Sequence, residues 1–98
     1  MGFFNAMSSI GKMNNLLTET EKQLKLISDL MERNVSKMRI QMEVNYLMGL
    51  YNEMVRVLDN SGGARVATYT FLGQKTRSLN ILMFLKETIQ ELNCSPMK

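Results

Sequence analysis

The chain has 98 residues, a formal net charge of +3, ten methionines, one cysteine, and neither histidine nor tryptophan. This length corresponds to one domain, because typical domains hold about 100 to 150 residues. The lack of histidine removes the commonest general base and the commonest metal ligand, and a single cysteine excludes an intrachain disulfide. The composition therefore predicts one globular domain over residues 1–98, with no enzyme activity, no metal and no cofactor.

The start of the chain and its apolar segments give no sign of export or of insertion into a membrane. No basic residue precedes the apolar residues 1–4, which differs from a signal peptide. The longest purely apolar stretch, residues 81–85, is far shorter than the roughly 20 residues that a membrane span needs. We therefore expect a cytoplasmic protein.

The first 60 residues have the pattern of long amphipathic helices. Neither glycine nor proline occurs between Gly11 and Gly49, so helices can run without interruption. Apolar residues recur with a mean step of about 3.67, close to the period of a helix: Leu24, Ile27, Met31, Val35, Met38, Met42, Tyr46, Leu50, Met54 and Val57. The spacing predicts helices over residues 5–33 and 36–60, with Thr18 and Glu21 placed as a capping box.

Residues 33–36 (Arg-Asn-Val-Ser) leave two alternatives open for the boundary between these helices. The apolar periodicity passes through this segment and favours one continuous helix. Compactness favours a break, because an unbroken helix over residues 18–60 would be about 63 Å long at 1.5 Å per residue. Helix propensity is low at these four positions, so a turn is allowed there.

Residues 59–63 (Asp-Asn-Ser-Gly-Gly) end the second helix with turn chemistry, and a third helix is predicted over residues 64–93. Residues 65–72 contain enough β-branched and aromatic side chains to form a strand. A lone strand would have no partner in this chain, so we favour a helix. If Gly73 breaks the segment, Thr76 or Ser78 can cap a separate helix. We expect residues 94–98 to fray.

The predicted fold class is all-α: an antiparallel bundle, or a coiled-coil-like hairpin, of two to three long helices. Between residues 38 and 58 a second apolar stripe lies beside the first and includes Ile40 and Val44. A helix that is apolar on two faces is either central in a bundle or shared with another subunit. We expect a homodimer to complete the fold; the alternative is a monomeric three-helix bundle.

Methionines are frequent in the predicted stripe. Methionine adapts to irregular partners and is over-used on binding surfaces, although it also fills ordinary cores. The candidate interface consists of Met31, Met38, Met42, Tyr46, Leu47, Leu50, Tyr51, Met54, Val55 and Leu58. The sequence therefore predicts a non-enzymatic protein–protein interaction or assembly module, adaptor or chaperone-like, that presents a Met-rich apolar helical face to a helical partner.

An alternative function is peripheral membrane association through the N-terminus. Phe3, Phe4, Met7, Ile10 and Leu17 share one face if residues 3–17 are helical. Residues 1–10 (Met-Gly-Phe-Phe-Asn-Ala-Met-Ser-Ser-Ile) resemble the amphipathic leader of the phage-shock protein A family. This resemblance covers about 17 residues and implies a helix that lies on a membrane. We favour instead a first helix that packs onto the bundle.

A further alternative is weak nucleic-acid binding through residues 65–86. This segment contains Arg65, Lys75, Arg77 and Lys86, no acidic residue, and the aromatic residues Tyr69 and Phe71. Basic residues interleaved with aromatic ones are typical of surfaces that bind single strands. Because the cluster is sparse and matches no recognition motif, a solvated face is the favoured interpretation and nucleic acid is not expected as a partner.

Overall fold

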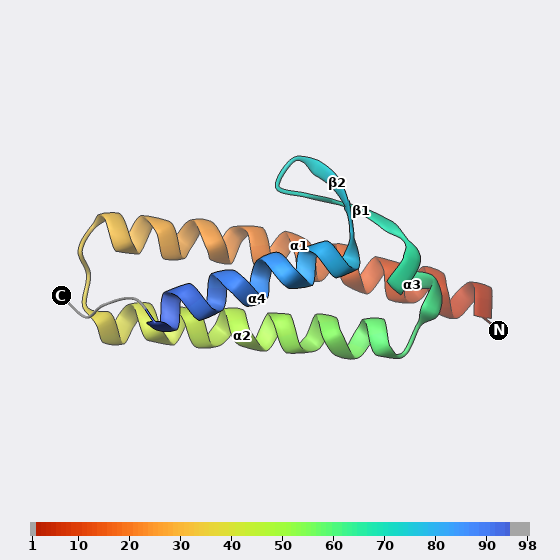
Figure 1. The fold of residues 1–98 in the computed structure, drawn as a ribbon, viewed down its shortest axis with the longest axis horizontal. Helices are drawn as coiled ribbons and strands as arrows, with labels where there is room; N and C mark the ends of the chain where they lie inside the picture. The colour runs from red at the N-terminus through yellow and green to blue at the C-terminus, as the bar shows by residue number, and fades with distance from the viewer. Residues whose placement is uncertain (1, 95–98) are drawn as a thin grey trace.

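The computed structural model, which describes residues 2–94, is a helical bundle with a small β-hairpin (Figure 1). The long helices α1 and α2 run antiparallel to each other, and α4 packs along α2. In chain order the elements are α1 (Gly2–Glu32), α2 (Lys37–Asp59), α3 (Gly62–Val66), β1 (Thr68–Phe71), β2 (Gln74–Arg77) and α4 (Ser78–Cys94). The predicted helical class is thus confirmed. The prediction of a purely helical fold is wrong, because β1 and β2 form a small sheet.

The chain breaks between α1 and α2, so the two helices are not continuous. Asn34 adopts a left-handed conformation with φ of 57°, which asparagine tolerates better than most residues. The N–H of Val35 donates to the carbonyl of Leu30 at 3.3 Å, which is the closing bond of a Schellman motif. Ser36 then caps α2, because its hydroxyl accepts the backbone N–H three residues later. The compactness argument was therefore right, and the continuous periodicity was misleading.

The predicted capping box at Thr18 is wrong, because Thr18 lies in the middle of α1. Its hydroxyl donates to the carbonyl oxygen of Asn14 at 3.0 Å, a bond made inside a helix. The helix continues toward the N-terminus because Met13 and Leu17 are buried in the core. The free energy of burying these side chains outweighs the local preference for a cap at this point.

The single helix predicted over residues 64–93 is also wrong, since it consists of α3, a β-hairpin and α4. The strands β1 and β2 pair antiparallel, with Phe71 opposite Gln74. Leu72 and Gly73 form the turn with φ of 54° and 81°, as a two-residue type I′ turn requires. The partner strand that the segment 65–72 was expected to lack therefore follows it directly. After the hairpin, α4 begins at Ser78, one of the two expected starts of a separate helix.

Leu72 is an unfavourable residue for the left-handed position that it occupies. The left-handed conformation destabilises the fold by about 1 kcal/mol or more for most non-glycine residues, and by less for asparagine. We expect Leu72→Asn to raise the free energy of unfolding by about 1 kcal/mol in urea unfolding experiments. The matched control is Leu79→Asn, an exposed position in regular helix, where asparagine should cost a few tenths of a kcal/mol. Equal losses in both variants would contradict the strain at Leu72.

The core lies between α1, α2 and α4 and is closed at one side by the hairpin. Its largest buried side chains come from all three long helices: Met13, Leu17, Val44, Leu47, Met54, Ile81 and Leu85. Alternate residues of β1, Tyr69 and Phe71, point into the same core. The hydroxyl of Ser78 donates to the carbonyl oxygen of Arg65 at 2.7 Å and ties the start of α4 to α3.

Candidate functional site

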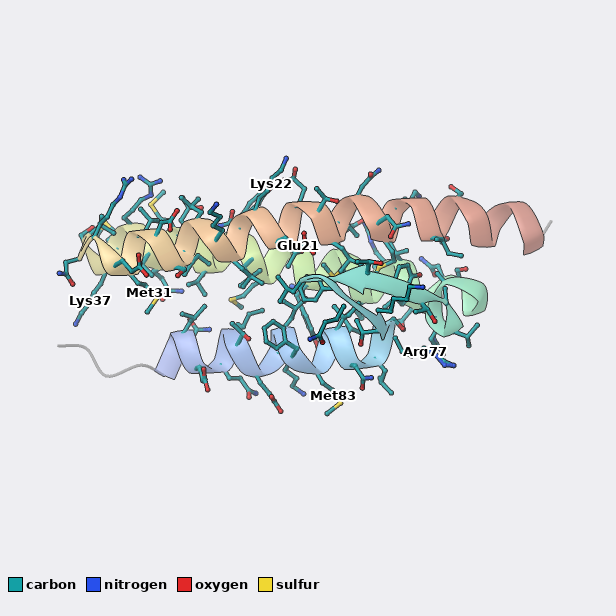
Figure 2. All side chains as sticks on the ribbon, turned by 90° about the horizontal axis from the view of Figure 1, so that it is seen from above. Glu21, Lys22, Met31, Lys37, Arg77 and Met83 are labelled. Atoms are coloured by element: carbon teal, nitrogen blue, oxygen red, sulfur yellow. The ribbon has the colours of Figure 1, made fainter. Side chains whose placement is uncertain are left out.

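The hairpin separates α4 from α1 over part of their length, as Figure 2 shows. Phe71 packs edge-on against Phe84 of α4, with ring centroids 6.0 Å apart. On the other side, the backbone N–H of Leu72 donates to Oε2 of Glu21 in α1 at 2.7 Å. The hairpin thus fills one end of the space between α1 and α4, and the remaining length of that space stays open.

This open part is an apolar groove, which we call the α1–α4 groove. Leu24, Ile27, Ser28, Met31 and Glu32 line it from α1, and Thr88 and Leu92 line it from α4. Its volume is about 370 Å³, within the range of about 300 to 1,000 Å³ that ligand pockets occupy. Residues spaced by three or four positions share one face of a helix, which explains why Leu24, Ser28 and Met31 line the groove together. Figure 2 shows Met31 on the side of α1 that faces α4.

The rim of the α1–α4 groove is acidic. Glu21 and Glu32 lie along it on α1. Glu91 follows Thr88 by three residues and so lies beside it on α4, whereas Glu87 follows Met83 by four and belongs to the exposed face of that helix. These carboxylates form no salt bridge with any residue in the described part of the chain. Residues 2–94 also contain no group of three acidic, cysteine or histidine residues placed to hold a metal ion. The rim therefore carries carboxylates that pair with no basic side chain in residues 2–94, on a chain of net positive charge.

A second apolar surface, which we call the outer stripe, lies on the exposed face of α2. It consists of Met38, Met42 and Tyr46, which are 76%, 61% and 53% exposed. Their spacing of four residues aligns them along one side of the helix. Lys37 and Arg39 flank the start of the stripe, and Arg39 also pairs with Glu43 at 3.2 Å. The outer stripe is therefore apolar with a basic end.

The structure divides the predicted interface residues into four groups. Met38, Met42 and Tyr46 form the outer stripe, and Met31 lies in the α1–α4 groove. Tyr51 and Val55 are half-buried. The others are buried in the chain's own core: Leu47, Leu50, Met54 and Leu58. The turn at residues 33–36 reverses the chain and separates residues that the periodicity had placed on one stripe.

Sequence reasoning missed the groove as a site. Its residues Leu24 and Ile27 were assigned to a helical stripe without a partner surface. Thr88 was not singled out, although it precedes Leu92 by four residues and follows Phe84 by four. This spacing of four residues puts Phe84, Thr88 and Leu92 on one side of α4, and it was the only sequence signal for the wall of the groove.

The exposed face of α4 carries a shorter apolar pair, Leu79 and Met83. Both side chains are more than half exposed, and they lie one helical turn apart. Figure 2 shows Met83 pointing away from the bundle. This pair spans one turn only, whereas the outer stripe spans two.

The aromatic residues of the predicted nucleic-acid segment face the protein interior. Tyr69 and Phe71 are buried, so they are not available for stacking on bases. Lys75 and Arg77 are exposed on β2, and Arg65 lies 3.5 Å from Asp59. The surface therefore offers the basic side chains that nucleic-acid binding needs, but not the aromatic rings on which bases would stack.

The predicted membrane-binding segment is helical from Gly2 onward. The side chains of Phe3, Phe4 and Met7 lie outside the described part of the structure, so their face is not assigned. Leu17, which was placed on the same face, is buried in the core. None of the described helices is both long and apolar enough to cross a bilayer.

Two surfaces therefore stand out on the described part of the chain, the α1–α4 groove and the outer stripe. Both are apolar, and their margins carry opposite charge. They come from helical segments on either side of the α1–α2 turn. No family model, curated protein or solved structure matches the chain.

Proposed function

We propose that this protein is a non-catalytic protein–protein interaction module that binds an amphipathic helix in its α1–α4 groove. The observation that carries this proposal is the combination of an apolar lining with an acidic rim. The lining residues Leu24, Ile27 and Leu92 supply apolar area, and Met31 adapts to the shape of a partner.

The dimensions of the groove fit two turns of a helix. From Leu24 to Glu32 it follows nine residues of α1, or about 12 Å at a rise of 1.5 Å between successive residues. A bound helix can place two or three side chains into this length, spaced by three or four residues. Each apolar side chain that becomes fully buried contributes about 1.5 to 3 kcal/mol before the entropic cost of binding.

The acidic rim favours a partner helix with basic flanks. Glu21, Glu32 and Glu91 come from both walls of the groove, so they attract positive charge on either side of a bound helix. Charge complementarity of this kind raises association rates and excludes partners of the wrong charge. Because Glu32 and Glu91 are exposed, the affinity is expected to fall as salt increases.

A synthetic helical peptide with leucines at i, i+4 and i+7 and with flanking lysines tests this proposal. Fluorescence anisotropy with the full chain should show saturable binding, and a peptide with glutamates in place of the lysines should bind far more weakly. The variant Met31→Lys should raise the Kd of the basic peptide about tenfold or more.

The matched control is Met83→Lys, because Met31 and Met83 are 45% and 55% exposed and lie on different faces of the molecule. Met83→Lys should leave the Kd of the peptide unchanged. Circular dichroism should show that both variants fold. Equal effects of the two substitutions, or no saturable binding by the unchanged protein, would refute the proposed function.

A further inference from the structure

We infer that the groove's partner is a second copy of this chain, whose outer stripe packs into the α1–α4 groove. This inference rests on the proposed function, because it uses the same groove. It adds the identity of the bound helix, α2, and the three side chains that enter the groove: Met38, Met42 and Tyr46.

The two surfaces match in length. The outer stripe extends over nine residues of α2, from Met38 to Tyr46, or about 12 Å. The groove extends over nine residues of α1, from Leu24 to Glu32, which is the same length. Three stripe side chains at intervals of one turn can therefore pack between the two walls of the groove.

The two surfaces also match in charge. Lys37 at the start of the outer stripe and Arg33 in the preceding turn would meet the carboxylates of the rim, while Arg39 is already paired with Glu43. A groove-to-groove contact would instead place the three rim carboxylates against their own copies, which is unfavourable. Charge therefore favours a contact between groove and stripe over a contact between two grooves.

The apolar pair on α4 is a weaker candidate for the same groove. Leu79 and Met83 are four residues apart, so they cover about 6 Å, half the length of the groove. The next residue at this spacing is Glu87, which would meet the acidic rim. The outer stripe has Tyr46 at the corresponding place and avoids this repulsion.

A contact between two different surfaces is heterologous, so its symmetry can be tested. After one groove–stripe contact forms, each pair of copies retains an unused groove and an unused stripe, and association continues unless a ring closes. A variant with a defective groove and a variant with a defective stripe should each fail to associate alone. Mixed together they should form a one-to-one dimer, because one intact groove meets one intact stripe.

Sedimentation velocity over a concentration series tests this inference with the full chain. The groove variant is Met31→Lys, the stripe variant is Met42→Glu, and the control is Met83→Glu on the exposed face of α4. The unchanged protein and the control should associate alike. The groove and stripe variants should each dissociate about tenfold or more readily, and their mixture should recover a dimer.

The outcomes separate this inference from the proposed function. If the unchanged protein stays monomeric to about 1 mM yet binds the basic peptide, self-association is refuted and the proposed function stands. If Met42→Glu associates normally, or if the mixture forms no dimer, the groove–stripe contact is refuted. If Met83→Glu alone weakens association, the α4 pair is the partner instead and the inference is wrong. Peptide binding to Met42→Glu should remain intact, since its groove is unchanged.

Discussion

Replacing Met54 by alanine is expected to lower the free energy of unfolding by about 2 to 5 kcal/mol, and the same replacement at Met42 by less than about 0.5 kcal/mol. Both residues lie on α2, and the sequence pattern placed both on one apolar stripe. Met54 is 0% exposed and belongs to the core cluster, whereas Met42 is 61% exposed. Truncation at Met54 therefore removes buried area and leaves a cavity, while truncation at Met42 removes area that is already in water.

Urea unfolding followed by circular dichroism measures both values. The experiment requires a protein concentration at which sedimentation shows monomer, because Met42 belongs to the proposed contact between copies. The two variants make the same chemical change in the same helix, so differences in helix propensity cancel. Similar losses for Met42 and Met54 would show that the outer stripe is buried in the monomer and would contradict the separation of core from surface described above.

The helices were predictable because their signal is local. Buried residues such as Leu47 and Leu50 on α2, and Ile81 and Leu85 on α4, recur at three or four residues, which any amphipathic helix requires. The turn at residues 33–36 was harder, because apolar residues keep their spacing across it. Periodicity reports which side of a helix is apolar, and it does not report whether two consecutive segments face the same core.

The hairpin was missed because its second strand and its turn carry weak signals. The strand Gln74–Arg77 has no apolar residue, and the turn has leucine where asparagine or glycine is usual. The bond from the Leu72 N–H to Glu21 joins residues 51 positions apart and is invisible to local analysis. The signal that was available was the alternation in β1, where Tyr69 and Phe71 are buried between exposed threonines.

The candidate site could be predicted only in part. Exposed methionines were expected, and Met38 and Met42 are exposed. The groove required knowledge of the tertiary structure, because its walls come from opposite ends of the chain and its shape depends on the hairpin between α1 and α4. The acidic rim could not be predicted for the same reason. Glu21 and Glu91 are far apart in the sequence, and only the tertiary fold brings them to the same groove.

The second large effect is expected at Tyr69, which joins the hairpin to α3. Its hydroxyl donates to the carbonyl oxygen of Ala64 at 2.6 Å in a buried position. Tyr69→Phe leaves that carbonyl without its partner and is expected to lower the free energy of unfolding by about 1 to 3 kcal/mol. The control is Tyr46→Phe on the exposed outer stripe, where the change should stay within about 0.5 kcal/mol.

Tyr69 also gives this prediction a dependence on pH. Burial raises the pKa of Tyr69 above its ordinary value, so the folded protein keeps this proton at a pH where the unfolded chain has begun to release it. The stabilisation by Tyr69 is therefore complete below about pH 10, the pKa of an unfolded tyrosine, and decreases as the pH rises above that value. Urea unfolding at about pH 8 and about pH 11 should show the difference between the unchanged protein and Tyr69→Phe narrowing at the higher pH. Other groups titrate in both proteins alike, so a constant difference would contradict a buried, hydrogen-bonded hydroxyl at this position.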